Sequence, residues 1–143
     1  MGKALRLVAV AIVAGPAFAQ VPDDTDDLLA VLAAALYPVE MMAYCHSEVA
    51  ADPGYRDAGA QWSERNGALL ATLEDRAKAA AVPDEARRAA DEQALAAIAA
   101  AVASQADKPA YCRFAAAIID GGYYDIDQRA DLKPALRRIF GME

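Results

Sequence analysis

The sequence predicts an all-α protein, an antiparallel bundle of five to six helices. Apolar residues recur every three or four positions along most of the chain, which is the spacing that gathers side chains on one face of a helix. No stretch has the strict alternation or the β-branched enrichment that is typical of a strand. Proline, glycine and aspartate interrupt the periodic segments, so we expect short connections and helices that fold back on one another.

The first 19 residues have the three parts of a secretory signal peptide. Lys3 and Arg6 form a basic start, Leu7–Ala14 is an unbroken apolar run, and Ala17-Phe18-Ala19 is a cleavage site with small outer residues. The apolar run is too short for a transmembrane helix, which needs about 20 residues. Gln20 follows the site, so no lipid-carrying cysteine is expected there.

We therefore expect an exported protein, periplasmic or secreted, with a single helical domain over residues 20–143 and no membrane anchor after cleavage. A retained N-terminal anchor is the alternative. The whole chain has 14 basic and 21 acidic residues and a net charge of −7. Nucleic acids and anionic membrane surfaces attract basic patches, so this balance predicts no nucleic-acid partner. A protein or small-molecule partner stays open.

The first two helices are expected on either side of Pro38. Acidic residues at 23–27 favour a helix start, because carboxylates cap the first turn and interact well with the helix dipole. Pro38 should end or kink this first helix, since proline disfavours helical geometry at the residue before it. A second helix is then expected over residues 38–51, before the breaker Asp52-Pro53-Gly54.

Four more helices are predicted after this breaker. The alanine-rich fourth helix indicates tight helix–helix contact, high helix propensity, or both. Asp107 should cap the fifth helix, and the glycine pair at 121–122 should end it. The approximate ranges are 55–81, 84–105, 107–120 and 131–140.

Cys45 and Cys112 are the only cysteines. Two cysteines in an exported chain usually form a disulfide. Cys45 lies on the apolar face of the second helix, so we expect the bridge to join this helix to the fifth. A metal-binding or redox thiol pair is the alternative, but the chain has no Cys-x-x-Cys, which does not favour a thioredoxin-like site.

The strongest local pattern is Trp62-x-x-Arg65-Asn66 on the third helix. In a structural interpretation, Trp62 anchors the core and Asn66 finds hydrogen-bond partners because a buried amide needs them. In a functional interpretation, Arg65 and Asn66 line a pocket for a small anionic or amide-bearing ligand, with Trp62 beside them. The acids that we consider as ion-pair partners of Arg65 are Glu40, Glu48 and Asp120.

Met42 and His46 lie one helical turn apart and form a candidate metal site. Thioether and imidazole groups suit copper in an oxidising compartment. The competing interpretation is that Met42 packs in the core, as methionines at apolar positions commonly do. His46 is the only histidine, so a bundle di-iron site with two Glu-x-x-His motifs is excluded. Covalent haem attachment is excluded by the lack of Cys-x-x-Cys-His.

These observations favour a non-catalytic binding or interaction protein without a cofactor, because the chain has no recognisable catalytic set or cofactor motif. Trp62, Arg65 and Asn66 are its candidate binding residues. A periplasmic copper-binding protein using Met42 and His46 is the first alternative. A small enzyme in which Arg65 and Asn66 act with a carboxylate is the second.

Three short motifs resemble a group of known proteins. The segment 44–46 (Tyr-Cys-His), the Trp62-x-x-Arg65-Asn66 helix and the ending from Cys112-Arg113-Phe114 to Gly121-Gly122-x-x-Asp125 are similar to small exported all-helical proteins of Proteobacteria. The likeness covers about residues 40–140. It implies a signal peptide, one disulfide and a helical fold. That group has no assigned activity, so it implies no catalytic or ligand-binding residues.

Overall fold

The computed structural model describes residues 24–142, and the expected signal peptide, residues 1–19, lies outside this range. The described residues form five α-helices and one π-helical turn, and they contain no strand. The all-helical class is therefore confirmed. The elements are α1 (Thr25–Tyr44), the π-helical turn η1 (Cys45–Val49), α2 (Pro53–Ala79), α3 (Asp84–Ala103), α4 (Lys108–Asp120) and α5 (Lys133–Phe140).

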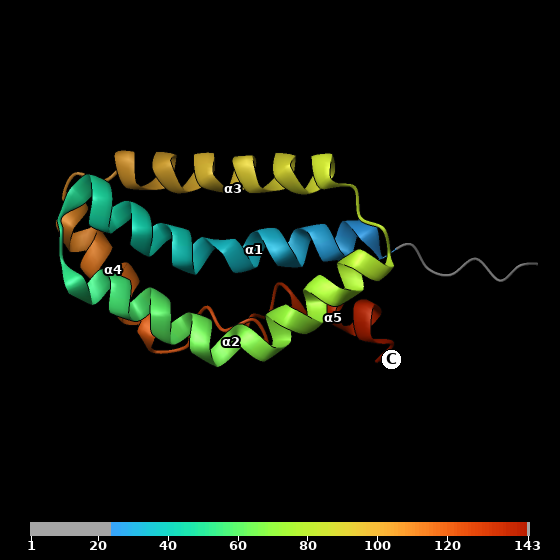
Figure 1. The fold of residues 1–143 in the computed structure, drawn as a ribbon. Coiled ribbons are helices and arrows are strands. Elements are labelled where there is room, and N and C mark those ends of the chain that lie inside the picture. Colours follow the sequence, from blue (N-terminus) through green and yellow to red (C-terminus); the bar gives the residue numbers. More distant parts are fainter. Residues whose placement is uncertain (1–23, 143) are drawn as a thin grey trace, which may run out of the picture.

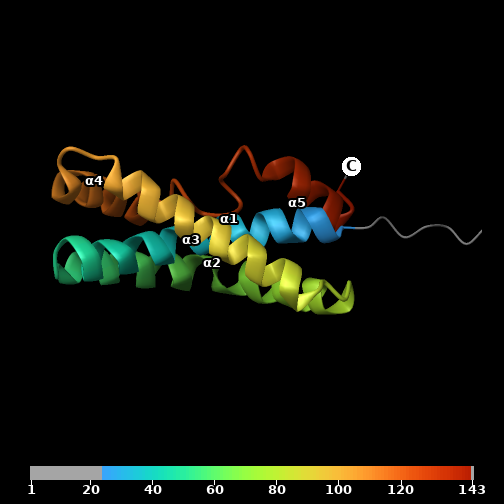
Figure 2. The same cartoon turned by 90° about the horizontal axis from the view of Figure 1, so that it is seen from above.

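Helix α1 lies at the centre of the fold (Figure 1). It runs between α3 and α2, and consecutive long helices reverse direction, so that α1 and α3 run parallel. Seen from above, α3 crosses α1 obliquely, with its start over α2 and its end over α4 (Figure 2). The buried side chains of α1 are Leu28, Val31, Leu32, Ala35, Pro38, Met41 and Met42.

This central position explains the composition of α1. Within residues 24–142, one helical stretch, Thr25–Val49, is long and apolar enough to cross a membrane. Its apolar side chains pack against the surrounding helices, and Val31 and Met41 are completely buried there. Packing in the protein core therefore accounts for part of the apolar character of this helix, since 44% of its most apolar window is buried.

The first helix does not end at Pro38, and the separate second helix expected over residues 38–51 is wrong, because α1 continues through Pro38 to Tyr44. Proline has no N–H, so the carbonyl of Ala34, four residues earlier, loses its helical hydrogen bond. Nη1 of Arg129, from the loop before α5, donates to that carbonyl at 3.4 Å. Pro38 itself is fully buried. Core packing and this tertiary contact together keep the helix continuous.

The later helices begin and end close to the predicted positions. Asp52 caps α2, since its side chain accepts from the N–H of Gly54 at 2.9 Å. Asp107 caps α4 as predicted, accepting from the N–H of Ala110 at 2.9 Å. These capping carboxylates satisfy backbone donors that have no partner within the helix.

The disulfide between Cys45 and Cys112 is present. It joins η1 to α4 with a Cα–Cα separation of 5.8 Å, and both cysteines are completely buried. The two positions are 67 residues apart in the chain. Closing a loop of that length stabilises the fold by roughly 4 kcal/mol on the chain-entropy estimate.

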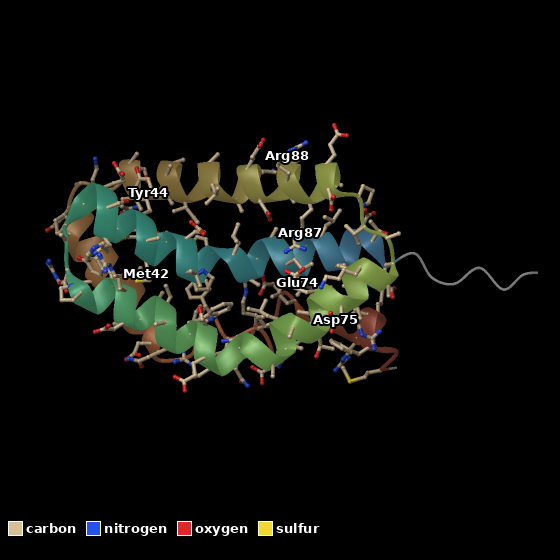
Figure 3. The ribbon with its side chains drawn as sticks, viewed as in Figure 1. Met42, Tyr44, Glu74, Asp75, Arg87 and Arg88 are labelled. Atoms are coloured by element: carbon tan, nitrogen blue, oxygen red, sulfur yellow. A yellow bond between two sulfur atoms is a disulfide. The ribbon has the colours of Figure 1, made fainter. Side chains whose placement is uncertain are left out.

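The buried residues of helix α3, Ile98 and Val102, both lie in its second half. Its first half has no buried side chain and is held against α2 by an ion pair. In its first half, Arg87 donates two hydrogen bonds to Glu74 of α2, at 2.6 and 2.9 Å. The two side chains face each other between the helices, whereas Arg88 lies on the outer side of α3 (Figure 3). The hydrogen bonds from Arg87 lower the pKa of Glu74.

We predict that the Glu74–Arg87 pair makes stability depend on acid pH. Because the pKa of Glu74 is lower in the folded state, its contribution is complete above the unfolded value of 4.5 and is lost as the pH falls through the folded pKa. Glu74→Gln should therefore lower the free energy of unfolding by about 1 kcal/mol or less at pH 6, and this difference from the parent should shrink as the pH is lowered from 6 to 3.

Urea denaturation at both pH values measures this effect. Asp75→Asn is the matched control, because Asp75 is 80% exposed and pairs only loosely with Lys78. A deficit of the Glu74 variant that persists unchanged at pH 3 would mean that the pair does not act through charge.

Candidate functional site

The predicted Trp62-x-x-Arg65-Asn66 motif faces the loop between α4 and α5. The indole Nε1 of Trp62 donates to the backbone carbonyl of Tyr124 at 2.9 Å. The amide of Asn66 donates to the carbonyl of Trp62 at 2.9 Å and to Asp125 at 3.0 Å, and its oxygen accepts from the N–H of Ile126 at 2.9 Å. We call this set of contacts between α2 and residues 124–126 the loop clamp.

Arg65 completes the loop clamp with an ion pair to Asp125. Its Nε lies 3.0 Å from one carboxylate oxygen, its Nη2 lies 3.1 Å from the other, and Nη2 also donates to the carbonyl of Ile119 at 2.7 Å. The hydrogen bond to Asp125 raises the pKa of Arg65. A fork-to-carboxylate pair of this kind fixes orientation as well as adding energy.

The ion-pair partner of Arg65 is therefore none of the acids considered, Glu40, Glu48 and Asp120, although the charge of Asp120 also helps to raise the pKa of Arg65. The partner is Asp125, and the reason is the turn that follows α4. Gly122 has φ of +81°, and a Cβ there would lie 3.0 Å from the carboxylate of Asp125. A residue with a side chain would be strained in this conformation and crowded by the carboxylate.

All the polar groups of Trp62 and Asn66 are used inside the protein. Both N–H groups and the oxygen of Asn66 have partners, as does the single donor of Trp62. Trp62 is 1% exposed and Asn66 is 4% exposed, whereas the side chain of Arg65 is 33% exposed. In this structure the three residues hold the loop in place, and of the three only Arg65 has a side chain that is substantially exposed to solvent.

The structure brings Arg65 and Asn66 together with the carboxylate of Asp125, as the enzyme hypothesis requires. Arg65 and Asn66 both donate hydrogen bonds to this carboxylate, so the three groups are paired inside the protein. A cavity of about 1010 Å³ lies over the same loop. Its lining includes Asp125 but neither Arg65 nor Asn66. The carboxylate therefore reaches the cavity while its two partners do not line it.

Met42 and His46 have separate contacts. Met42 is 1% exposed and packs against Gly59, where an added Cβ would lie 3.4 Å from the Cβ of Met42. His46 is partly buried, and its Nδ1 lies 3.1 Å from the carbonyl of Asp52. Within residues 24–142, no group of three or more His, Cys, Asp or Glu side chains is placed to hold a metal ion.

A groove between α1 and α3 is the feature that the sequence did not indicate. Its volume is about 600 Å³, within the range of small-molecule pockets, which is about 300–1,000 Å³. Its walls are mostly alanine, because small side chains on both helices leave the space between them open. The lining residues are Leu29, Ala30, Ala33, Ala34, Tyr37, Ala90, Gln93, Ala94, Ala97, Tyr124 and Arg129.

One end of the groove is aromatic and polar. Tyr37 stacks on Tyr124 with ring centroids 5.2 Å apart, and the guanidinium of Arg129 lies 5.6 Å from the centroid of the Tyr124 ring. Burial raises the pKa of Tyr37, and hydrogen bonds to Tyr111 and Tyr124 raise it further. The carbonyl of Tyr124 belongs to the loop clamp, so the loop clamp also fixes the position of Tyr124 at the aromatic end of the groove.

No known protein family, curated protein or solved structure matches this chain.

We predict that loss of Asn66 destabilises the fold. Asn66→Ala leaves the buried N–H of Ile126 without its acceptor and removes one donor from Asp125, and an unsatisfied buried group costs about 1–3 kcal/mol. Urea denaturation should show a loss in that range. The matched control is Glu64→Ala on the exposed side of α2, which should change stability by no more than about 0.5 kcal/mol. Equal stability of the two variants would contradict the role given to Asn66.

Proposed function

We propose that this protein is a non-catalytic binding protein and that its site is the groove between α1 and α3. The observation that carries the proposal is an open groove of about 600 Å³ with apolar walls and one polar end. Such a combination suits small molecules, because apolar walls supply most of the binding energy while a few polar groups fix orientation.

The loop clamp supports the same choice. The buried donors of Trp62 and Asn66 are already paired, so a ligand would have to break internal hydrogen bonds to use them. Binding along the apolar walls of the groove would break no internal hydrogen bond of this kind. We therefore assign Trp62, Arg65 and Asn66 to positioning the loop, and the groove to binding.

We further propose that the protein works outside the cytoplasm, in the periplasm or after secretion. A disulfide is compatible with an oxidising compartment. The basic start, apolar run and cleavage site in the first 19 residues favour export for an independent reason.

We predict that the groove binds a neutral apolar dye, N-phenyl-1-naphthylamine, with enhanced fluorescence and saturation at one dye per chain. Ala94→Phe places a large ring within the lining and should weaken binding at least about tenfold, since the added ring occupies the space of the ligand. Fluorescence titration of the disulfide-bonded protein measures the dissociation constant.

Ala96→Phe is the matched control. Ala96 is exposed, does not line the groove, and lies about 200° around α3 from Ala94. It adds the same ring to the opposite face of the helix, so its dye affinity should stay within about twofold of the parent. Equal affinities of the two phenylalanine variants, or no saturable binding by the parent protein, would rule out the groove as the site.

A further inference from the structure

We infer that the groove is specific for an anionic amphiphile, whose acid group lies against Arg129 and whose apolar part lies along the alanine walls. This inference rests on the proposed function and adds the chemical class of the ligand. Arg129 is the only charged residue among those that line the groove. Its side chain is 19% exposed, so its charge is largely withdrawn from water.

Contacts with α1 and with the loop between α4 and α5 hold the guanidinium at the end of the groove. Nη1 donates to the carbonyl of Ala34, which Pro38 leaves without its helical partner. The guanidinium also lies beside the ring of Tyr124, which the loop clamp fixes. Nε and Nη2 donate to Asp131 at 3.1 and 2.6 Å. The position of the cation is thus set before any ligand arrives.

The guanidinium retains hydrogen-bonding capacity. It has five N–H groups, and its contacts with residues 24–142 use three of them. One N–H on each terminal nitrogen is left for a further acceptor. A carboxylate, sulfonate or phosphate oxygen fits these donors better than a neutral group, because hydrogen bonds between charged partners are stronger.

Asp131 is the internal competitor of the ligand. Its side chain is 63% exposed, and the hydrogen bond from Arg129 lowers its pKa, so it stays ionised at neutral pH. The ligand would use the two N–H groups that Asp131 leaves free, so this carboxylate opposes an anion through its charge, and its exposure to water weakens that effect. The chain as a whole carries −7, so selection for an anion depends on the local charge of Arg129.

The test compares two dyes that share an aromatic framework. N-phenyl-1-naphthylamine is neutral, and 8-anilinonaphthalene-1-sulfonate carries one additional sulfonate. We expect the parent protein to bind the sulfonate more tightly than the neutral dye at low ionic strength. Arg129→Gln should reduce this preference by about tenfold while leaving affinity for the neutral dye within about threefold. Arg129→Lys should retain part of the preference because it keeps the charge.

Two further variants separate local from general charge effects. Asp131→Asn removes the competitor and should increase the preference for the sulfonate severalfold; because this residue is exposed, the variant is expected to fold. Arg137→Gln changes the net charge as much as Arg129→Gln, but at an exposed residue outside the groove, and should leave the preference unchanged.

Tight binding of the neutral dye with no preference for the sulfonate, or a preference that survives Arg129→Gln, would overturn the anionic ligand and leave the groove in place. Failure of both dyes to bind the parent protein would overturn the groove and the inference together.

Discussion

The carboxylate of Asp125 is the group on which the attachment of the loop between α4 and α5 to α2 depends. It accepts hydrogen bonds from Arg65 and Asn66 of α2, and Asn66 in turn accepts from the backbone N–H of Ile126. A loop that lies about 60 residues away in the chain is thereby attached to the face of a helix. Since Ile126 is completely buried beside these contacts, the attachment closes the core as well as positioning the loop.

The same attachment shapes the groove. Tyr124 uses its carbonyl to accept from Trp62 and its ring to stack on Tyr37, so the loop clamp and the groove meet in one residue. Arg129, a little further along the loop, reaches the carbonyl that Pro38 leaves free in α1. An irregularity in the central helix and a loop held from the other side therefore combine to place a cation at the end of an apolar space.

The parts of the fold that local chemistry determines could be predicted from the sequence. Asp107 caps its helix as predicted, the breaker at Asp52-Pro53-Gly54 separates two helical segments, and the only two cysteines pair. The break at Pro38 was predicted wrongly because a distant arginine compensates for the missing N–H. Asp125 could not be identified as the partner of Arg65, since the pairing depends on how Gly122 turns the chain after α4. The groove was missed because alanine allows either close packing or open space, and only the separation of α1 and α3 decides between them.

Native-state hydrogen exchange at the backbone N–H of Ile126 tests the loop clamp most directly. This amide belongs to a loop, where exchange is commonly fast, yet it is buried and donates to the side chain of Asn66 at 2.9 Å. If the loop clamp holds the fold as described, its free energy of exchange should approach that of global unfolding. Exchange at the rate of an exposed loop amide would contradict the account.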